Sequence, residues 1–328
     1  MRSALYLPKF LAVSLIYAAT IPAYADNDDR KKCDSDKLKF SNITLPLGAD
    51  VLQPTAANSS GWITGYYRDT PGMLKGFLLR GKRYSDVSFP NTASYTIEAS
   101  FPVGITQRGL VAGVAFEAAG PAHSYTRMGN SVTELIYPGS QTGTTFIRSM
   151  SSDGKILGES VDGQTGLPVL FVYKDGVYTP LSLPANPPAT DIYWASINSS
   201  GHLLGAGDNA SGRVLLVAKR NHYKVLPTIP GNLYNVPISL LDSGEVIVDS
   251  SDLDLPADPE YGANWFGNIL RKGKWQQIRA PKDTKRITHL TGAAMLNNDN
   301  LLLLGTYATN ASYILSPFKA TERDCDND

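Results

Sequence analysis

Four acidic side chains gather in one short segment of the second half of the chain. They are Asp252, Asp254, Asp258 and Glu260. Carboxylate oxygens are the ligands that Ca²⁺ prefers, so this segment is a candidate calcium site. The spacing is not that of an EF-hand loop, because the glycine and the closing glutamate are misplaced. A solvated acidic loop is the competing interpretation, and no other cofactor is expected.

The four histidines form no recognisable metal-binding or catalytic pattern. They are His123, His202, His222 and His289, and none has His-x-x-x-His or similar spacing to another. We expect His123 to be structural and His202, which follows a turn glycine, to lie at the surface. No Gly-x-Ser-x-Gly elbow is present. Carboxylates such as Glu159 and Asp249 could pair as in a glycosidase, but many acids are expected on the same face and no pair is singled out. The sequence therefore favours a role other than catalysis.

Aromatic and charged side chains are concentrated in segments that we expect to be loops or strand ends. The candidate binding residues are Tyr66, Tyr67, Arg68, Asp69, Tyr193, Trp194, Asp208, Asp249, Tyr261, Trp265 and Tyr307. Tyrosine and tryptophan contribute large contact areas to protein interfaces. The same rings can stack on sugars, so this set does not separate a protein partner from a glycan. Some of these rings must instead pack between sheets.

A repeated unit must position these residues. A strand-like run ends in the tight turn Asn58-Ser-Ser-Gly61, and the same pattern recurs five times. The turn positions are residues 61, 109, 154, 201, 244 and 300. Five of them are glycine, which adopts positive φ without strain. Asn300 stands in the glycine place of the last unit and tolerates the same backbone conformation.

Each unit continues with a second hairpin. Its third strand carries an apolar residue at Phe77, Tyr125, Phe171, Leu216, Ile269 and Tyr313. Its fourth strand ends in proline, but the last unit lacks this strand. Residues 39–46, near the N-terminus, have the form of the missing strand. We therefore predict an all-β, six-bladed β-propeller closed by an N-terminal strand that completes the C-terminal blade, which leaves no exposed sheet edge.

The candidate binding residues belong to one side of this propeller. Connections within each hairpin are tight turns, and we call the side that carries them the turn face. The longer connections, between second and third strands and between units, share the opposite side, which we call the loop face. Binding residues are usually carried by loops on a rigid scaffold, so we expect function on the loop face.

The N-terminus has the pattern of an export signal. Arg2 and Lys9 precede an apolar run that ends in Ala23-Tyr24-Ala25, which predicts cleavage after Ala25. No later stretch approaches the roughly 18 apolar residues of a membrane helix. Removing residues 1–25 leaves 28 basic and 30 acidic residues, and this balance argues against nucleic acid. We expect a periplasmic or secreted monomer comprising a signal peptide (1–25), an acidic lead-in (26–37), the propeller (38–318) and a tail (319–328).

The two cysteines lie beside the expected closure. Cys33 precedes the N-terminal strand and Cys325 follows the last repeat. A pair of cysteines in an exported chain predicts a disulfide. It would close a loop of nearly the whole chain and stabilise the fold by roughly 5 kcal/mol on the chain-entropy model. Two unpaired surface thiols are the alternative.

The units resemble the HAF-type extracellular repeats. The best matches are Ile197-Asn-Ser-Ser-Gly201 followed by Gly205, and His123-Ser-Tyr125 in the place of His-Ala-Phe. The resemblance covers residues 38–317 and is degenerate, since Val248 replaces the second glycine of the fifth unit. It implies an exported β-propeller, and it implies no general activity.

Three classes of function fit these observations. The leading hypothesis is an exported binding protein whose loop face docks a protein partner, such as a toxin or enzyme that it neutralises. The second is a carbohydrate-binding or carbohydrate-active propeller. The third is a structural propeller of envelope assembly.

Overall fold

The regular structure of the chain is built from strands. The computed structural model describes residues 38–118, 120–140, 143–220, 222–252, 264–283, 285–309 and 315–322, and every regular element in these ranges is a β-strand. No helix in these ranges is long and apolar enough to cross a membrane. The strands are β1 (Leu38–Asn42), β2 (Val51–Ala57), β3 (Ile63–Arg68), β4 (Leu74–Arg80), β5 (Arg83–Asp86), β6 (Ile97–Ile105), β7 (Val111–Glu117), β8 (Ala122–Met128), β9 (Ser131–Leu135), β10 (Phe146–Met150), β11 (Ile156–Val161), β12 (Pro168–Lys174), β13 (Val177–Pro180), β14 (Thr190–Ile197), β15 (Leu203–Asn209), β16 (Gly212–Lys219), β17 (His222–Val225), β18 (Tyr234–Leu240), β19 (Val246–Ser251), β20 (Trp265–Arg271), β21 (Lys274–Ile278), β22 (Thr288–Met295), β23 (Leu301–Ala308) and β24 (Leu315–Glu322).

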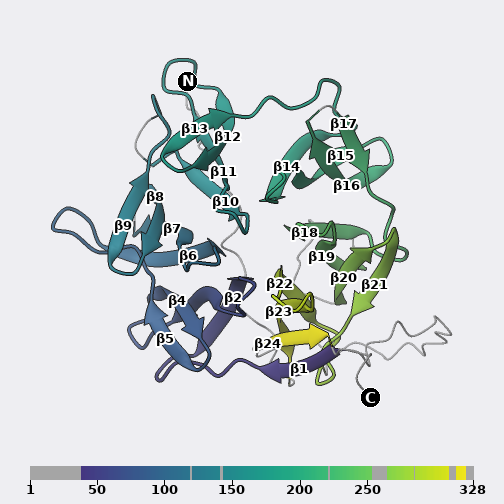
Figure 1. Ribbon diagram of the computed structural model, residues 1–328, viewed down its shortest axis with the longest axis horizontal. Coiled ribbons are helices and arrows are strands. Elements are labelled where there is room, and N and C mark those ends of the chain that lie inside the picture. Colours follow the sequence, from purple (N-terminus) through teal and green to yellow (C-terminus); the bar gives the residue numbers. More distant parts are fainter. Residues whose placement is uncertain are drawn as a thin grey trace.

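The strands form antiparallel sheets around a common axis (Figure 1). Four sheets have four strands each, in the orders β10-β11-β12-β13, β14-β15-β16-β17, β18-β19-β20-β21 and β22-β23-β24-β1. A fifth, eight-stranded sheet consists of two meanders, β2–β5 and β6–β9, joined by one parallel pair between Leu74 and Ala99. The first strand of each group lies nearest the axis in Figure 1. The all-β propeller arrangement predicted from the sequence is therefore present.

We number the repeated units in chain order. Units one to five are β2–β5, β6–β9, β10–β13, β14–β17 and β18–β21, and unit six is β22–β24 with β1.

Strand β1 joins the two ends of the described chain. It pairs antiparallel with β24, from Leu38 opposite Glu322 to Asn42 opposite Phe318. The strand predicted at residues 39–46 is thus present in a shorter form. The third strand of unit six differs from expectation, because Phe318 takes the place given to Tyr313, which lies outside the described residues. Strand β23 extends to Ala308, and the third strand of the unit, β24, begins only at Leu315. It ends at Glu322, beyond residue 318, where we had predicted the end of the propeller.

The repeated turn is stabilised by its first residue. Asn58 is buried, and its side-chain oxygen accepts hydrogen bonds from the backbone N–H groups of Ser60 at 3.1 Å and Trp62 at 3.0 Å. Its amide nitrogen donates to the backbone oxygen of Thr106, in the turn of the next unit, at 3.0 Å. Asparagine at this position therefore shapes its own turn and ties it to its neighbour.

The glycine place of the last turn is shifted by one residue from our prediction. Asp299, not Asn300, has positive φ there, at 61°. Its N–H donates to the backbone oxygen of Leu296, and the N–H of Leu296 donates to the oxygen of Asn300. Aspartate tolerates the left-handed region as asparagine does, so residue type alone could not distinguish the two positions.

The second glycine of the repeat makes room for an aromatic ring. Gly158 lies opposite Phe171, and a Cβ atom on this glycine would come within 2.3 Å of the ring. Gly113 has the same relationship to Tyr125. These rings fill the interior of their sheets and are completely buried.

Candidate ligand site in the axial cavity

Every innermost strand contains an irregularity at the same place. The antiparallel register of β2, β6, β10, β14, β18 and β22 shifts by one residue just beyond the pair formed with the second glycine or its replacement. The extra residues are Thr55, Val103, Arg148, Ala195, Ile238 and Thr291. β-Bulges of this kind redirect side chains. All of these residues line one cavity.

The cavity lies between the innermost strands and has a volume of about 500 Å³. Its wall is largely apolar, and most of its hydroxyl groups link neighbouring units. The hydroxyl of Thr55 donates to the backbone oxygen of Pro102 at 2.6 Å, and that of Thr291 donates to Pro54 at 2.5 Å. Among the described lining residues, Arg148 and Asp242 are the charged ones. The cavity therefore has the composition of a small-molecule site, apolar with a few placed polar groups.

Arg148 is the cationic group in the middle of the cavity wall. Its side chain is 14% exposed, and it forms an ion pair with Glu159 of the same unit. The guanidinium carbon also lies 5.1 Å from the centre of the Tyr193 ring in unit four. Burial raises the pKa of Tyr193, the charge of Glu159 adds to this effect, and Arg148 opposes it. The phenol therefore stays protonated and can donate a hydrogen bond.

Large and small side chains alternate from unit to unit at one position of the second strand. This position follows the second glycine of the repeat or its replacement. Units one, three and five carry Tyr66, Glu159 and Asp249 there. Units two, four and six carry the smaller Val114, Ala206 and Thr306. Tyr66 meets Phe101 of the next unit edge-on, with ring centres 4.9 Å apart. Burial raises the pKa of Tyr66 to about 12, and its hydroxyl lies 2.6 Å from the side-chain oxygen of Gln53. The equivalent contact between units five and six joins Asp249 to His289.

Asp249 and His289 form an oriented acid–imidazole pair. The Asp249 side chain is 8% exposed, and its Oδ2 lies 2.7 Å from Nδ1 of His289. Its other oxygen accepts the backbone N–H of Leu290 at 3.3 Å. Burial raises the pKa of the Asp249 carboxyl, while the charge and hydrogen bond of His289 act in the opposite direction. The ring of Trp265 covers one side of the imidazole, with centres 4.9 Å apart.

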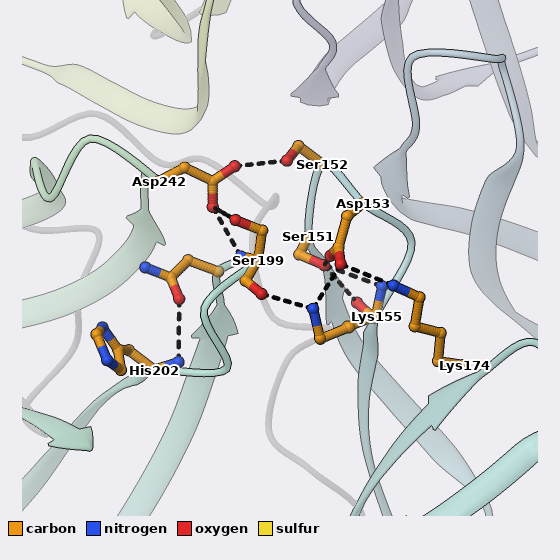
Figure 2. Close-up of polar contacts among 9 residues, drawn as sticks. Ser151, Ser152, Asp153, Lys155, Lys174, Ser199, His202 and Asp242 are labelled. Atoms are coloured by element: carbon orange, nitrogen blue, oxygen red, sulfur yellow. Dashed lines mark hydrogen bonds and ion pairs between the residues drawn. The ribbon is translucent and has the colours of Figure 1, made fainter. Parts of the chain in front are cut away.

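A set of polar contacts joins neighbouring turns at the turn-face end of the cavity (Figure 2). Asp242 in the turn of unit five accepts hydrogen bonds from the backbone N–H of Ser199 at 2.7 Å and from its hydroxyl at 2.6 Å. Asp242 also accepts a hydrogen bond from Ser152, which lies two units away. These contacts draw the turns of units three, four and five together.

Beside this cluster, Asp153 binds two lysines (Figure 2). Burial alone would raise the pKa of Asp153, but hydrogen bonds from Lys155, Lys174 and Ser151 outweigh it and hold the pKa well below its usual range. Lys155 also donates to the backbone oxygen of Ser199, in the next unit.

The structure separates the candidate binding residues into two groups. Tyr193 lines the cavity. Tyr66 and Asp249 each contact an innermost strand of the next unit, through Phe101 and His289, and Trp265 lies beside His289. Trp194 and Tyr307 are only 7% and 3% exposed. They belong to the packing between strands, so they offer little surface to a partner.

The remaining candidates lie at the rim or in the wall of the sheets. Tyr67 packs on Phe77, Arg68 pairs with Asp50, and Asp69 accepts the backbone N–H of Met73 in its own loop. Asp208 is exposed and lies 4.0 Å from Arg213. Tyr261 lies outside the described residues.

The candidate calcium site is represented in the structure by one residue. The carboxylate of Asp252 accepts hydrogen bonds from the backbone and side chain of Asn264. Asp254, Asp258 and Glu260 lie outside the described residues. Within the described ranges, no group of three or more His, Cys, Asp or Glu side chains is arranged to hold a metal ion.

Sequence reasoning missed Arg148, Phe101 and Gln53, and it did not connect His289 with the site. All four lie on innermost strands, on which Tyr193 and Trp194 were the only candidates named from the sequence. Their alternation with buried neighbours was a usable signal, but the bulge that redirects Arg148 depends on strand pairing.

No family model matches the chain, and no curated protein matches it. Several solved structures are similar in fold. AofleA from Arthrobotrys oligospora is 10% identical, with a TM-score of 0.51 over 88% of this chain and 87% of that chain. A fungal lectin from Aleuria aurantia, described as a six-bladed β-propeller with a novel fucose recognition mode, is 11% identical, with a TM-score of 0.43 over 80% and 89%. A gluconolactonase from Xanthomonas campestris is 10% identical, with a TM-score of 0.46 over 84% and 88%. At such identities the likeness concerns the fold alone.

Proposed function

We propose that this protein is an exported six-bladed β-propeller that binds a carbohydrate in its axial cavity, reached from the loop face. The count of six rests on the six innermost strands with equivalent bulges and on the two meanders of the eight-stranded sheet. Export rests on the signal-peptide pattern at residues 1–25, which lies outside the described residues. The HAF-type resemblance supports the same interpretation.

The observation that carries the proposal is the wall of the cavity. It combines the aromatic rings of Phe101 and Tyr193 with the Arg148–Glu159 ion pair. Sugars present apolar faces that stack on such rings and hydroxyl groups that bond to charged side chains. The volume of about 500 Å³ suits a mono- or disaccharide rather than a folded partner.

Docking of a protein partner on the loop face is the competing proposal, including a role in neutralising a toxin or enzyme. It gains less from the structure, because Trp194 and Tyr307 are buried and do not contribute to an exposed aromatic patch. A partner could still use rim residues such as Arg68 and Asp208.

A glycan array followed by calorimetry tests the proposal. We expect saturable binding of a small saccharide, and we expect Arg148→Gln to weaken it about 10- to 100-fold, as the loss of a charge-assisted hydrogen bond implies. The matched control is Arg220→Gln, at an exposed position away from the cavity. No saccharide binding, together with recovery of a stoichiometric protein from periplasmic extract, would favour the docking proposal instead.

A further inference from the structure

His289 occupies a position whose equivalents in units two, four and five line the ligand cavity. It precedes the bulge of β22 as Phe101 precedes that of β6 and Tyr193 that of β14, and both of those residues line the cavity. The strand runs from His289 toward the turn face, so the imidazole lies at the loop-face end. Its side chain is 24% exposed and therefore accessible to a small molecule.

The two nitrogens of His289 have different environments. Nδ1 is bound to the buried carboxylate of Asp249, whereas Nε2 has no hydrogen-bond partner among the described residues. A carboxylate at Nδ1 favours the tautomer with the proton on Nδ1, and Nε2 then carries an available lone pair. His123 provides the contrast, because Glu134 and Glu117 bind both of its nitrogens at 2.7 and 2.8 Å. His289 alone of these two can accept a proton from a ligand or water.

The fold itself does not require a carboxylate at the position of Asp249. Units two and four have Val114 and Ala206 at the same register position. Burying a carboxylate is costly, and apolar residues often stabilise as well as a buried ion pair does. The pair formed by Asp249 of unit five and His289 of unit six therefore points to a chemical role beside the cavity.

We propose that His289, positioned by Asp249, is a general base that hydrolyses acyl esters of the bound carbohydrate; the carbohydrate part rests on the proposed function above. In this step, Nε2 takes a proton from water as the water oxygen bonds to the ester carbonyl carbon. The tetrahedral intermediate then collapses, the bond to the alkoxide breaks, and the alkoxide leaves with the proton from Nε2. The products are a carboxylic acid and the free hydroxyl, and no other reactant is needed.

Acyl transfer fits the pair of Asp249 and His289, which we call the dyad, better than cleavage of a glycosidic bond does. Glycosidases use two carboxyl groups that act directly on the sugar. Here Asp249 is directed at His289, and Glu159 is directed at Arg148. Both carboxylates are therefore engaged by other side chains, whereas Nε2 of the imidazole has no partner among the described residues.

The first experiment determines the tautomer of His289 by proton–nitrogen NMR of the histidine side chains at neutral pH. We expect the proton on Nδ1 in the wild type and a shift toward the other tautomer in Asp249→Asn, which cannot accept in the same way. A wild-type imidazole with its proton on Nε2 overturns the proposal. Assignment uses His289→Gln, whose spectrum lacks the signal.

The second experiment measures hydrolysis of para-nitrophenyl acetate, a simple ester without a sugar. We expect His289→Gln to lower kcat/KM about 10²-fold or more, the usual contribution of a general base. Asp249→Asn should lower the rate and alter its pH profile, as expected of a positioning residue. His222→Gln, which removes an exposed imidazole elsewhere, should leave the rate unchanged.

The outcomes separate the two proposals. A rate of ester hydrolysis that is the same in His289→Gln as in the wild type overturns the proposed catalytic role of His289. Ester hydrolysis with the expected tautomer, but without saccharide binding, retains the dyad and refutes only the carbohydrate ligand. Saccharide binding without hydrolysis retains the proposed function and refutes the dyad.

Discussion

Gly158 lies directly beneath the ring of Phe171, across the pairing of β11 with β12. A methyl group on this glycine would overlap the ring, which is completely buried and has no room to move. We predict that Gly158→Ala lowers the free energy of unfolding by about 1–3 kcal/mol, the usual cost of overpacking. Urea unfolding measures the change.

The same contact offers its own control. Phe171→Leu replaces the ring with a smaller side chain and should reduce the destabilisation caused by Gly158→Ala. The double variant should therefore lose less free energy of unfolding than the sum of the losses in the two single variants. Strict additivity would mean that the ring does not determine the glycine. Unit five is consistent with this view, because Val248 stands opposite Asn268 and not opposite an aromatic ring.

We predict that His123 contributes to the stability of the fold in a pH-dependent way. Burial alone would lower its pKa, but hydrogen bonds and charges from Glu117 and Glu134 outweigh burial and raise the pKa above its ordinary value of 6.5. The folded state therefore binds the proton more tightly than the unfolded state does. The stabilisation is fully present below about pH 6.5 and is lost as the pH rises through the folded-state pKa.

Comparison of unfolding at about pH 6 and about pH 9 tests this contribution. His123→Gln should cost about 2 kcal/mol at the lower pH, because two partly buried carboxylates lose their partner, and less at the higher pH. His222→Gln is the control at an exposed site. An equal cost at both pH values would contradict a charged His123.

Lys155 and Lys174 share the carboxylate of Asp153 but differ in what else they bind. Only Lys155 also reaches the backbone oxygen of Ser199, in unit four. Surface ion pairs contribute little, so Lys174→Met should cost less than about 0.5 kcal/mol, and Lys155→Met about 1 kcal/mol. Thermal or urea unfolding of the two variants side by side checks the order, and the reverse order would refute the role of the contact between units.

Asp242 should hold the turn of unit four in place. Without its carboxylate, the N–H and hydroxyl of Ser199 lose their acceptor, so Asp242→Ala should destabilise the fold by about 1–2 kcal/mol. Amide hydrogen exchange at Ser199 should accelerate more than exchange in the sheet core. Ser243→Ala is the matched control, since that hydroxyl donates to Glu245 of its own turn and, among the described residues, makes no hydrogen bond to another unit.

Much of the fold was predictable because its signals are local. A glycine such as Gly61 is required by positive φ within one turn, and the form of residues 39–46 repeats that of each fourth strand. The closing pair of β1 and β24 follows from counting strands, because one strand was missing at one end and one was left over at the other.

The site was predictable only in part, because it depends on strand register. Trp194 and Tyr193 are neighbours, and a strand directs successive side chains to opposite sides, so one lines the cavity and the other is buried. Sequence alone did not reveal which was which. The bulge at Arg148 and the contact between Asp249 and His289 depend on pairing across sheets and units, which a linear pattern does not contain.

The disulfide between Cys33 and Cys325 stays a prediction from the sequence. The last described pair of β1 and β24 is Leu38 with Glu322, and in the sequence Cys33 precedes Leu38 by five residues and Cys325 follows Glu322 by three. Both cysteines are outside the described residues. We predict that Cys33→Ser lowers the melting temperature of the oxidised protein and that reductant produces the same loss. Two free thiols in the exported protein, found by thiol titration, would contradict the bond.

The pairing of β1 with β24 also bears on how the chain reaches its final state. Residues 38–42 leave the ribosome early, whereas their partners at 318–322 are made almost three hundred residues later. Loop closure over such a separation is slow, and the contact cannot form before residues 318–322 have been made. Until then unit six lacks its outer strand. Closure of the sheet of unit six must therefore await residues 318–322, and a chain truncated before Leu315 would lose β24 and leave β1 without its partner strand.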